Sequence, residues 1–390
     1  MIFGLEESSQ TLFLYTIVLV LFFFVPQVYD TNIYHNVVSL KKNSFWSDSR
    51  MYFICAIFAL VFGFRYDYMQ DWSSYVRYYE YIMSGGLNDG WREPGFYIYV
   101  KILCKLGLNY YSMFFVECFI WIFSIFYLFR DHKNYLWFVL PLVFLKTSEA
   151  MVISRQYFAM SFLYIAYKNY FNRSKFYAIL FAVAAFSLHY SILLWVCFFI
   201  IMKKVEGLSA KWIVVLFVLI TIFSTIFASS LTSIASSLSI YLDSNGLGTS
   251  VYDSDSLGYY TRTGASIRQV LTLSISRGAY IWLYYKFKNN NFIVDKFINN
   301  LLIIGMVGML IGVALGYNMI FSRFASYVTI FYNIGWGILT YIAYKQRRII
   351  GSLYMYIALV VLFYLFGGFY STLLSTFNLQ DVNPFLIYDL

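Results

Sequence analysis

The chain has few of the residues that build metal centres and disulfide frameworks. Its 390 residues include 3 histidines and 4 cysteines. The cysteines lie singly inside apolar segments and form no C-x-x-C pair, so neither a disulfide framework nor a zinc site is indicated. The histidines, His35, His132 and His189, are too few to favour a histidine-built metal centre. We therefore expect no metal site.

Charged residues are also scarce, at 12% of the chain. Hydrophobic residues make up 61%, and the mean hydropathy is +0.66. A soluble core of this size would not bury so much apolar surface, so the composition predicts an all-α, polytopic membrane protein. The apolar run 12–25 has no basic n-region before it and no A-x-A-like site after it. We expect it to be a first transmembrane helix that is retained.

Aromatic residues, in contrast, are abundant, at 23% of the chain. Such rings suit both membrane interfaces and the faces of sugars. The net charge of +9 does not indicate a nucleic-acid partner, because in a membrane protein the placement of basic residues matters more than their sum. We expect no nucleic-acid partner.

The apolar runs predict about twelve crossings in a single transmembrane domain, residues 1–390. Two segments leave the count open. Residues 96–108 are short for a crossing of roughly 30 Å and carry Lys101 and Lys105. Residues 175–203 are too long for one upright span and are interrupted near His189. The other spans lie near 11–28, 51–64, 111–129, 135–150, 155–171, 212–232, 268–287, 297–315, 321–344 and 349–372.

The placement of lysine and arginine decides between two arrangements, because cytoplasmic loops collect basic residues. With 96–108 re-entrant or interfacial and 175–203 a hairpin, 17 basic residues lie inside and 11 outside. If 96–108 crosses the membrane and 175–203 is one span, 14 basic residues lie inside and 14 outside. The first arrangement is favoured. It predicts both termini outside, with external loops at 65–95 and 229–266.

Arginines gather on the predicted outer face. They account for 8 of the 11 outer basic residues, whereas lysines account for 12 of the 17 inner ones. The positive charge of lysine is sufficient to orient a membrane protein. Only arginine has a planar guanidinium group that can pair with two phosphate oxygens at once. The outer face is therefore predicted to bind an anion such as phosphate or pyrophosphate. The alternative is that these arginines pair with the equally abundant outer carboxylates.

Both external loops are candidates for substrate contact. The 65–95 loop concentrates charge in a chain that has little of it. Within it, we expect Asp67, Arg77 and Glu80 to form a salt-bridge network that shapes the loop. The 229–266 loop is rich in Ser, Gly, Thr and Asp, and it is too long for a simple turn. It is predicted to be a lid or a substrate-contacting loop.

Six short motifs follow one another along the chain. They are Arg65 after an apolar helix, Asp71-Trp-x-x-Tyr75, Glu93-Pro-x-Phe96, Ser154-Arg-Gln156, Phe186-Ser-Leu-His-Tyr-Ser191 and Ser322-Arg-Phe-x-x-Tyr327. In this order, over about residues 50–330, the chain resembles the EpsG/Wzy-like polysaccharide polymerases of bacterial envelopes. It departs from the family at Met69, where glycine is usual, so a backbone conformation that glycine takes easily is not available there.

The resemblance implies a polymerase of the bacterial cytoplasmic (inner) membrane, with its active site facing the periplasm or exterior. Such enzymes transfer a growing glycan from undecaprenyl pyrophosphate to a fresh lipid-linked repeat unit and release undecaprenyl pyrophosphate. They need no metal or nucleotide cofactor. The implied partners are the undecaprenyl-pyrophosphate-linked oligosaccharide as donor and acceptor, the membrane lipid, and a chain-length regulator protein.

The resemblance also implies roles for individual residues. Arg155 and Arg323 would stabilise charge on pyrophosphate, and His189 would transfer a proton, so these three are the predicted catalytic residues. The alternatives are that Arg155 is a helix-end arginine paired with Glu149 and that His189 is structural. Glu93 is expected to position sugar hydroxyls or to orient an arginine. The predicted substrate-binding residues are Arg65, Asp71, Tyr75, Arg92, Glu93, Gln156, Arg262 and Arg268.

Two other function classes remain open. A flippase for the same lipid-linked unit should carry charges deep in several spans, whereas the arginines here collect on one side. An O-antigen ligase or a sugar acetyltransferase would share the outward-facing site. A ligase typically carries its histidine in a large outer loop, and the 229–266 loop has no histidine. Both classes are disfavoured relative to a polymerase.

Overall fold

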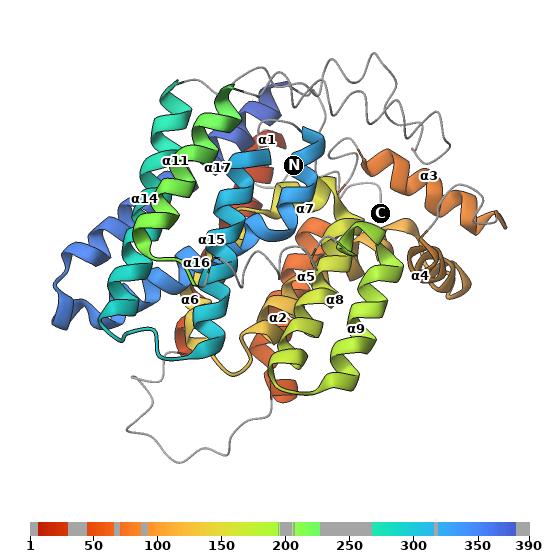
Figure 1. The fold of residues 1–390 in the computed structure, drawn as a ribbon. Helices are drawn as coiled ribbons and strands as arrows, with labels where there is room; N and C mark the ends of the chain where they lie inside the picture. Colours follow the sequence, from red (N-terminus) through yellow and green to blue (C-terminus); the bar gives the residue numbers. More distant parts are fainter. Residues whose placement is uncertain are drawn as a thin grey trace. The chain divides into compact units, whose positions relative to one another are not determined.

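The computed structural model of the chain describes residues 7–29, 45–65, 71–86, 93–193, 195, 205, 207–226, 267–315 and 319–379. Every regular element in these residues is helical, as the composition predicts (Figure 1). The all-α class is therefore confirmed. The chain divides into two compact units, residues 1–193 with 362–390, and residues 194–361.

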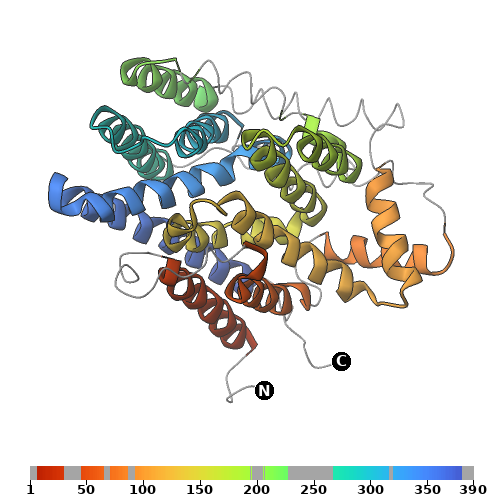
Figure 2. The same cartoon turned by 90° about the horizontal axis from the view of Figure 1, so that it is seen from below.

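The first unit is built around four helices that lie side by side (Figures 1 and 2). α5 contacts both α2 and α8, and α8 also packs on α9. The helices of this unit are α1 (Glu7–Phe24), α2 (Ser49–Gly63), α3 (Trp72–Met83), α4 (Pro94–Lys105), α5 (Tyr110–Leu128), α6 (Leu136–Phe144), α7 (Thr147–Val152), α8 (Ser154–Phe171) and α9 (Lys175–Leu188). Short 3-10 turns lie at η1 (Val25–Tyr29), η3 (Phe45–Ser47), η4 (Lys133–Tyr135) and η5 (Tyr190–Leu193).

The second unit contains a smaller set of described helices. α15 packs along α16, and α11 contacts both α14 and α15. The elements are α11 (Ala210–Ile226), α14 (Ile267–Asn289), α15 (Lys296–Leu315) and α16 (Met319–Ile350). A last helix, α17 (Leu353–Leu379), continues across the division into the first unit.

Helix α9 has an apolar outer face. Phe176, Ile179 and Val183, spaced three and four residues apart, are 71%, 65% and 60% exposed. Residues at this spacing form one stripe along a helix. An exposed stripe of large apolar side chains is unfavourable in water and favourable against hydrocarbon. The packing of α9 therefore supports a membrane environment.

The predicted number of crossings is not confirmed. Within the described ranges, α5 and α15 are long and apolar enough to cross a membrane, and shorter apolar helices cover 13–27, 49–63, 175–188, 210–223 and 353–367. The run predicted as a span at 135–150 is divided into α6, of 9 residues, and α7, of 6. Neither reaches the roughly 20 residues that a crossing needs. The segment 96–108 forms α4, whose 12 residues span roughly 18 Å, so it is short, as predicted.

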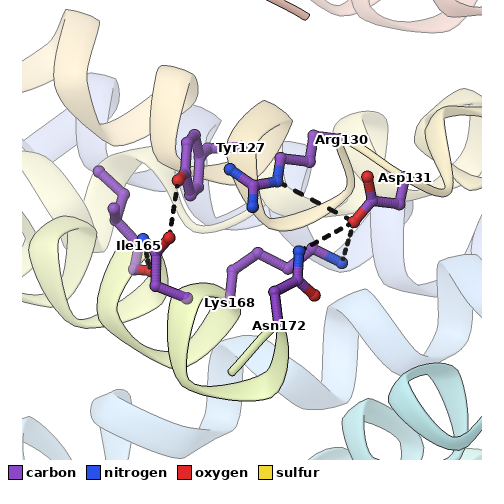
Figure 3. Close-up of polar contacts among 7 residues, drawn as sticks. Tyr127, Arg130, Asp131, Ile165, Lys168 and Asn172 are labelled. Atoms are coloured by element: carbon purple, nitrogen blue, oxygen red, sulfur yellow. Dashed lines mark hydrogen bonds and ion pairs between the residues drawn. The ribbon is translucent and has the colours of Figure 1, made fainter. Parts of the chain in front are cut away.

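Asp131, just after α5, organises a polar cluster at one end of the first unit (Figure 3). Its Oδ2 accepts hydrogen bonds from Nζ of Lys168 at 3.1 Å and from Nδ2 of Asn172 at 3.3 Å, and it lies 4.0 Å from Nε of Arg130. The Lys168 side chain is only 1% exposed. Asp131 therefore compensates a buried positive charge and ties the end of α8 to the end of α5.

Asp48, just before α2, forms a second cluster at the same end. Its carboxylate pairs with Nε of Arg50 at 3.1 Å and with Nζ of Lys133 at 2.9 Å. The two clusters draw together the connections before α2, after α5 and after α8. The charge rule places these three connections on one side of the membrane, and the structure brings them to one end of the unit.

Candidate active site

Glu93, Arg155 and His189 meet at the other end of these helices. Glu93 lies directly before α4, Arg155 lies in the first turn of α8, and His189 lies directly after α9. Oε2 of Glu93 accepts a hydrogen bond from Nη1 of Arg155 at 2.9 Å, and Oε1 lies 2.9 Å from Nδ1 of His189. Arg155 opens α8 and Lys168 lies in its last turn, so the candidate site and the Asp131 cluster occupy opposite ends of one helix.

The local sequence Glu93-Pro94-Gly95 explains this geometry. Pro94 occupies the first turn of α4, where its fixed φ fits a helix and its missing N–H is not needed. The residue before a proline favours extended backbone, and Glu93 has φ −85° and ψ 104°. Gly95 lets α4 approach α9 closely, because a Cβ at this position would lie 2.7 Å from the carbonyl carbon of Ser187. This close approach brings Glu93 within reach of His189.

The three side chains are largely shielded from solvent. The Glu93 side chain is 13% exposed, and those of Arg155 and His189 are each 19% exposed. Burial alone would raise the pKa of the Glu93 carboxyl, but the hydrogen bond from His189 and the charge of Arg155 outweigh it and hold this pKa below its ordinary value. Glu93 is therefore a carboxylate at neutral pH, and each of its oxygens holds one partner.

The Glu93 carboxylate orients two groups that can do different chemistry, His189 and Arg155. When Nδ1–H of His189 donates to Glu93, the basic lone pair of the ring lies on Nε2. Arg155 adds a positive charge to the N-terminus of an 18-residue helix, whose first N–H groups also favour anions. The arrangement can accept a proton at one group and bind an anion at the other.

Three predicted substrate-binding residues, Asp71, Tyr75 and Gln156, lie in the same unit as this cluster. Tyr75 and Gln156 are largely buried, at 6% and 5% exposed. The Tyr75 ring packs against Phe96 with the centroids 6.1 Å apart, and burial raises the pKa of its phenol to about 12. Asp71 directly precedes α3, where its carbonyl accepts a hydrogen bond from the N–H of Tyr75 at 3.1 Å. Substrate binding by these residues stays a prediction.

Arg65 lies in the interior, whereas its place in a charged loop suggests an exposed residue. It is 0% exposed, and its two Nη atoms donate to the carbonyls of Phe62 at 2.9 Å and Met151 at 3.2 Å. The guanidinium also lies 4.3 Å from the centroid of the Phe114 ring. In this position Arg65 joins the end of α2 to α7. It does not line the outer surface.

The alternative partner considered for Arg155 is engaged elsewhere. Glu149, in α7, forms an ion pair with Lys146 at 2.5 Å, and Arg155 forms its ion pair with Glu93. Arg155 is therefore oriented by the carboxylate that also holds His189.

Two residues of this region were not singled out from the sequence. Gly95 sets the spacing of α4 and α9, as described above. Glu117, in α5, is 4% exposed and accepts a hydrogen bond from the hydroxyl of Ser154, the residue before Arg155. The sequence does carry a signal for Glu117, because it is the sole carboxylate in the apolar run 110–128, and a charge inside a membrane helix marks a functional candidate.

For the remaining predicted residues the structure describes no side-chain position. Arg268 and Arg323 belong to α14 and α16 of the second unit, and the structure does not describe their side chains. The catalytic role of Arg323 and the binding role of Arg268 stay predictions. Outside the described residues lie Met69, Arg92, Arg262 and the 229–266 loop.

A model of the EpsG family matches residues 50–382, which include Glu93, Arg155 and His189. The chain belongs to the EpsG family. The EpsG family comprises Wzy-like polysaccharide polymerases, so the resemblance carried by the six motifs is confirmed. Comparison with curated proteins and with solved structures gave no match.

Membership of the EpsG family indicates the general activity of the chain. The family is associated with polysaccharide polymerases of glycosyltransferase type and with exopolysaccharide synthesis. Together with the apolar helices, it indicates a membrane protein. Within the described residues, the Glu93 carboxylate holds an arginine and a histidine together.

Proposed function

We propose that the chain joins undecaprenyl-pyrophosphate-linked oligosaccharide repeat units and releases undecaprenyl pyrophosphate. The observation that supports this proposal is the Glu93 carboxylate, which holds Arg155 on one oxygen and His189 on the other. One carboxylate thereby holds a proton acceptor on one side and an anion-binding group on the other. A general base for the acceptor hydroxyl and a cation for the departing pyrophosphate both accelerate glycosyl transfer from a pyrophosphate-linked donor.

In the proposed reaction, the bond between C1 of the donor sugar and its pyrophosphate oxygen breaks. A new bond forms between C1 and the hydroxyl oxygen of the acceptor sugar. The hydroxyl proton passes to Nε2 of His189, which acts as general base and then returns the proton to solvent. The negative charge on the departing pyrophosphate is stabilised by Arg155 and the N-terminus of α8. Glu93 acts as a positioning residue for both groups, and the reaction so written needs no metal or nucleotide cofactor.

The distribution of charge favours an outward-facing site in the bacterial cytoplasmic membrane. The basic residues around Asp48 and Asp131 lie at the end of the helices opposite to Glu93. Cytoplasmic connections collect lysine and arginine, so that end is placed in the cytoplasm under this proposal. The site then faces the periplasm or exterior, where the lipid-linked donor and acceptor would be present in the same bilayer.

Deletion of the gene in its native host, followed by gel analysis of the surface glycan, tests this function. Loss of a polymerase leaves one repeat unit attached, loss of a ligase leaves none, and loss of a flippase accumulates the unit inside the cell. Complementation with Arg155→Ala should leave the single-unit product of the deletion strain unchanged, whereas the wild-type gene should restore long-chain glycan. Arg77→Lys is the matched control, because Arg77 is exposed on α3. Long-chain glycan from the Arg155→Ala strain would overturn the proposed mechanism.

A further inference from the structure

A small cavity lies inside the first unit, next to the first turn of α8. All the residues that line it are buried, including Arg65, Glu117, Trp121 and Ser154. They come from α2 and its end, from α5, from α7 and from the start of α8. The cavity has a volume of about 10 Å³, which is the room that one water molecule needs.

Four polar atoms of the lining residues have no hydrogen-bond partner among the residues that the structure describes. They are Nε of Arg65, Nε1 of Trp121, Oε1 of Glu117 and the hydroxyl oxygen of Tyr157. The four residues are 0%, 3%, 4% and 2% exposed. An unsatisfied buried polar group costs about 1–3 kcal/mol, so four of them lining one cavity call for a common partner.

The other polar atoms of these side chains are already engaged. Both Nη atoms of Arg65 donate to backbone carbonyls, and Oε2 of Glu117 accepts from the Ser154 hydroxyl. Within the described part of the chain, no direct ion pair joins Arg65 to Glu117, although both line the cavity. A polar gap of this kind is bridged by a molecule that can both accept and donate hydrogen bonds.

The donor and acceptor pattern identifies the ligand. Two N–H donors, one carboxyl oxygen and one hydroxyl oxygen match a water molecule, which accepts two hydrogen bonds and donates two. A cation would face the charge of Arg65 and two N–H groups, and a polyatomic anion such as phosphate would not fit in about 10 Å³. We propose that the cavity binds one water molecule, held by Arg65 Nε, Trp121 Nε1, Glu117 Oε1 and the Tyr157 hydroxyl.

This water connects the interior to the candidate site. Glu117 holds the Ser154 hydroxyl through its second oxygen, and Arg155 follows Ser154 in the first turn of α8. The water and Glu117 together fix that turn against the end of α2. Glu117 is therefore a positioning residue for Arg155. This last step rests on the proposed function, whereas the water site does not.

X-ray radiolytic labelling tests the water site directly. Radiolysis of a bound water produces hydroxyl radicals that oxidise adjacent side chains, and Trp121 and Met151 line the cavity with oxidisable groups. Met113 is the matched control, because it is 0% exposed, lies in α5 and does not line the cavity. We expect Met151, which is 2% exposed, to be oxidised several-fold faster than Met113. Equal rates for the two methionines in the folded wild-type protein would overturn the water site.

Three variants separate the water site from the positioning role of Glu117. Trp121→Phe removes one of the four partners of the water and keeps an aromatic ring, so labelling of Met151 should fall toward that of Met113. Arg155→Ala should label like the wild-type protein, because the site does not depend on catalysis. Glu117→Gln should lower the rate of chain extension by up to about a hundredfold, the cost of misplacing a catalytic group by about 1 Å, and should shift its pH profile. Wild-type rate and pH profile for folded Glu117→Gln would overturn the positioning role and leave the water site standing.

Discussion

Replacing Glu93 with Gln tests the candidate site through a single group. The substitution keeps the shape of the side chain and removes the charge that Arg155 and His189 share. An amide has one acceptor oxygen, so it can accept from one of the two donors while its NH₂ group faces the other. One of the two 2.9 Å contacts therefore becomes a donor–donor contact, and either Arg155 or His189 loses its orientation.

The size of the effect follows from the burial of the cluster. A hydrogen bond to a charged group contributes about 1.5–3 kcal/mol, and breaking a fully buried pair costs about 3–5 kcal/mol. The side chains are 13% and 19% exposed, so solvent screens part of the loss. We expect the free energy of unfolding to fall by about 2–3 kcal/mol. A loss of about 2.7 kcal/mol in the transition state lowers a rate hundredfold, and we expect chain extension to slow by at least that factor.

Extension of purified lipid-linked repeat units in proteoliposomes, resolved as a ladder on a gel, measures this rate. Glu80→Gln is the matched control, because Glu80 is exposed on α3 and lies outside the cluster. Size-exclusion chromatography and thermal unfolding separate a loss of catalysis from a loss of folding. A folded Glu93→Gln protein that extends chains at the wild-type rate would refute the argument that one carboxylate organises the site.

Three further predictions follow from particular contacts. Because the pKa of Glu93 is held below its ordinary value, its contribution to stability is present above that ordinary pKa and is lost as pH falls through the lower folded pKa. The difference in unfolding temperature between wild type and Glu93→Gln should therefore be constant above about pH 5 and disappear in stronger acid. Gly95→Ala should destabilise the protein by about 1–3 kcal/mol and reduce chain extension, because the added Cβ would push α4 away from Ser187 and separate Glu93 from His189; normal activity in the gel assay would contradict this. Asp131→Asn should lower the free energy of unfolding by about 1–2 kcal/mol, discounted because Asp131 is 52% exposed, and should leave the rate of extension unchanged, because the cluster lies at the far end of α8.

The sequence predicts that the fold is all-α and that residues 96–108 form a short helix, but it does not predict where a long apolar run is broken into two helices. Lys101 and Lys105 indicate that residues 96–108 do not form a comfortable crossing, and α4 has 12 residues. The apolar run at 135–150 has no such charges in its centre, and average hydropathy is insensitive to a break of two residues. The structure divides this run at Leu145 and Lys146, between α6 and α7.

For the candidate site, the sequence predicts types of residue better than partners. Glu93 is recognisable as a group that could orient an arginine, but Arg155 and His189 lie 62 and 96 residues away from it, and only the packing of α4 against α9 and α8 selects them. Arg65 follows an apolar helix and opens a charged loop, which suggests exposure. Its burial depends on backbone carbonyls, one of them 86 residues away, that no sequence pattern reveals.

The apolar stripe on α9 has a consequence for how the proposed enzyme would meet its substrate. The stripe of Phe176, Ile179 and Val183 runs along the helix that ends at His189. A substrate anchored by a long polyprenyl tail diffuses within the plane of the bilayer, so it would reach the base along a lipid-facing surface and never leave the membrane. The encounter rate is then set by the number of substrate molecules per unit area of bilayer. Diluting the lipid-linked substrate with inert lipid should slow chain growth even when its bulk concentration stays constant.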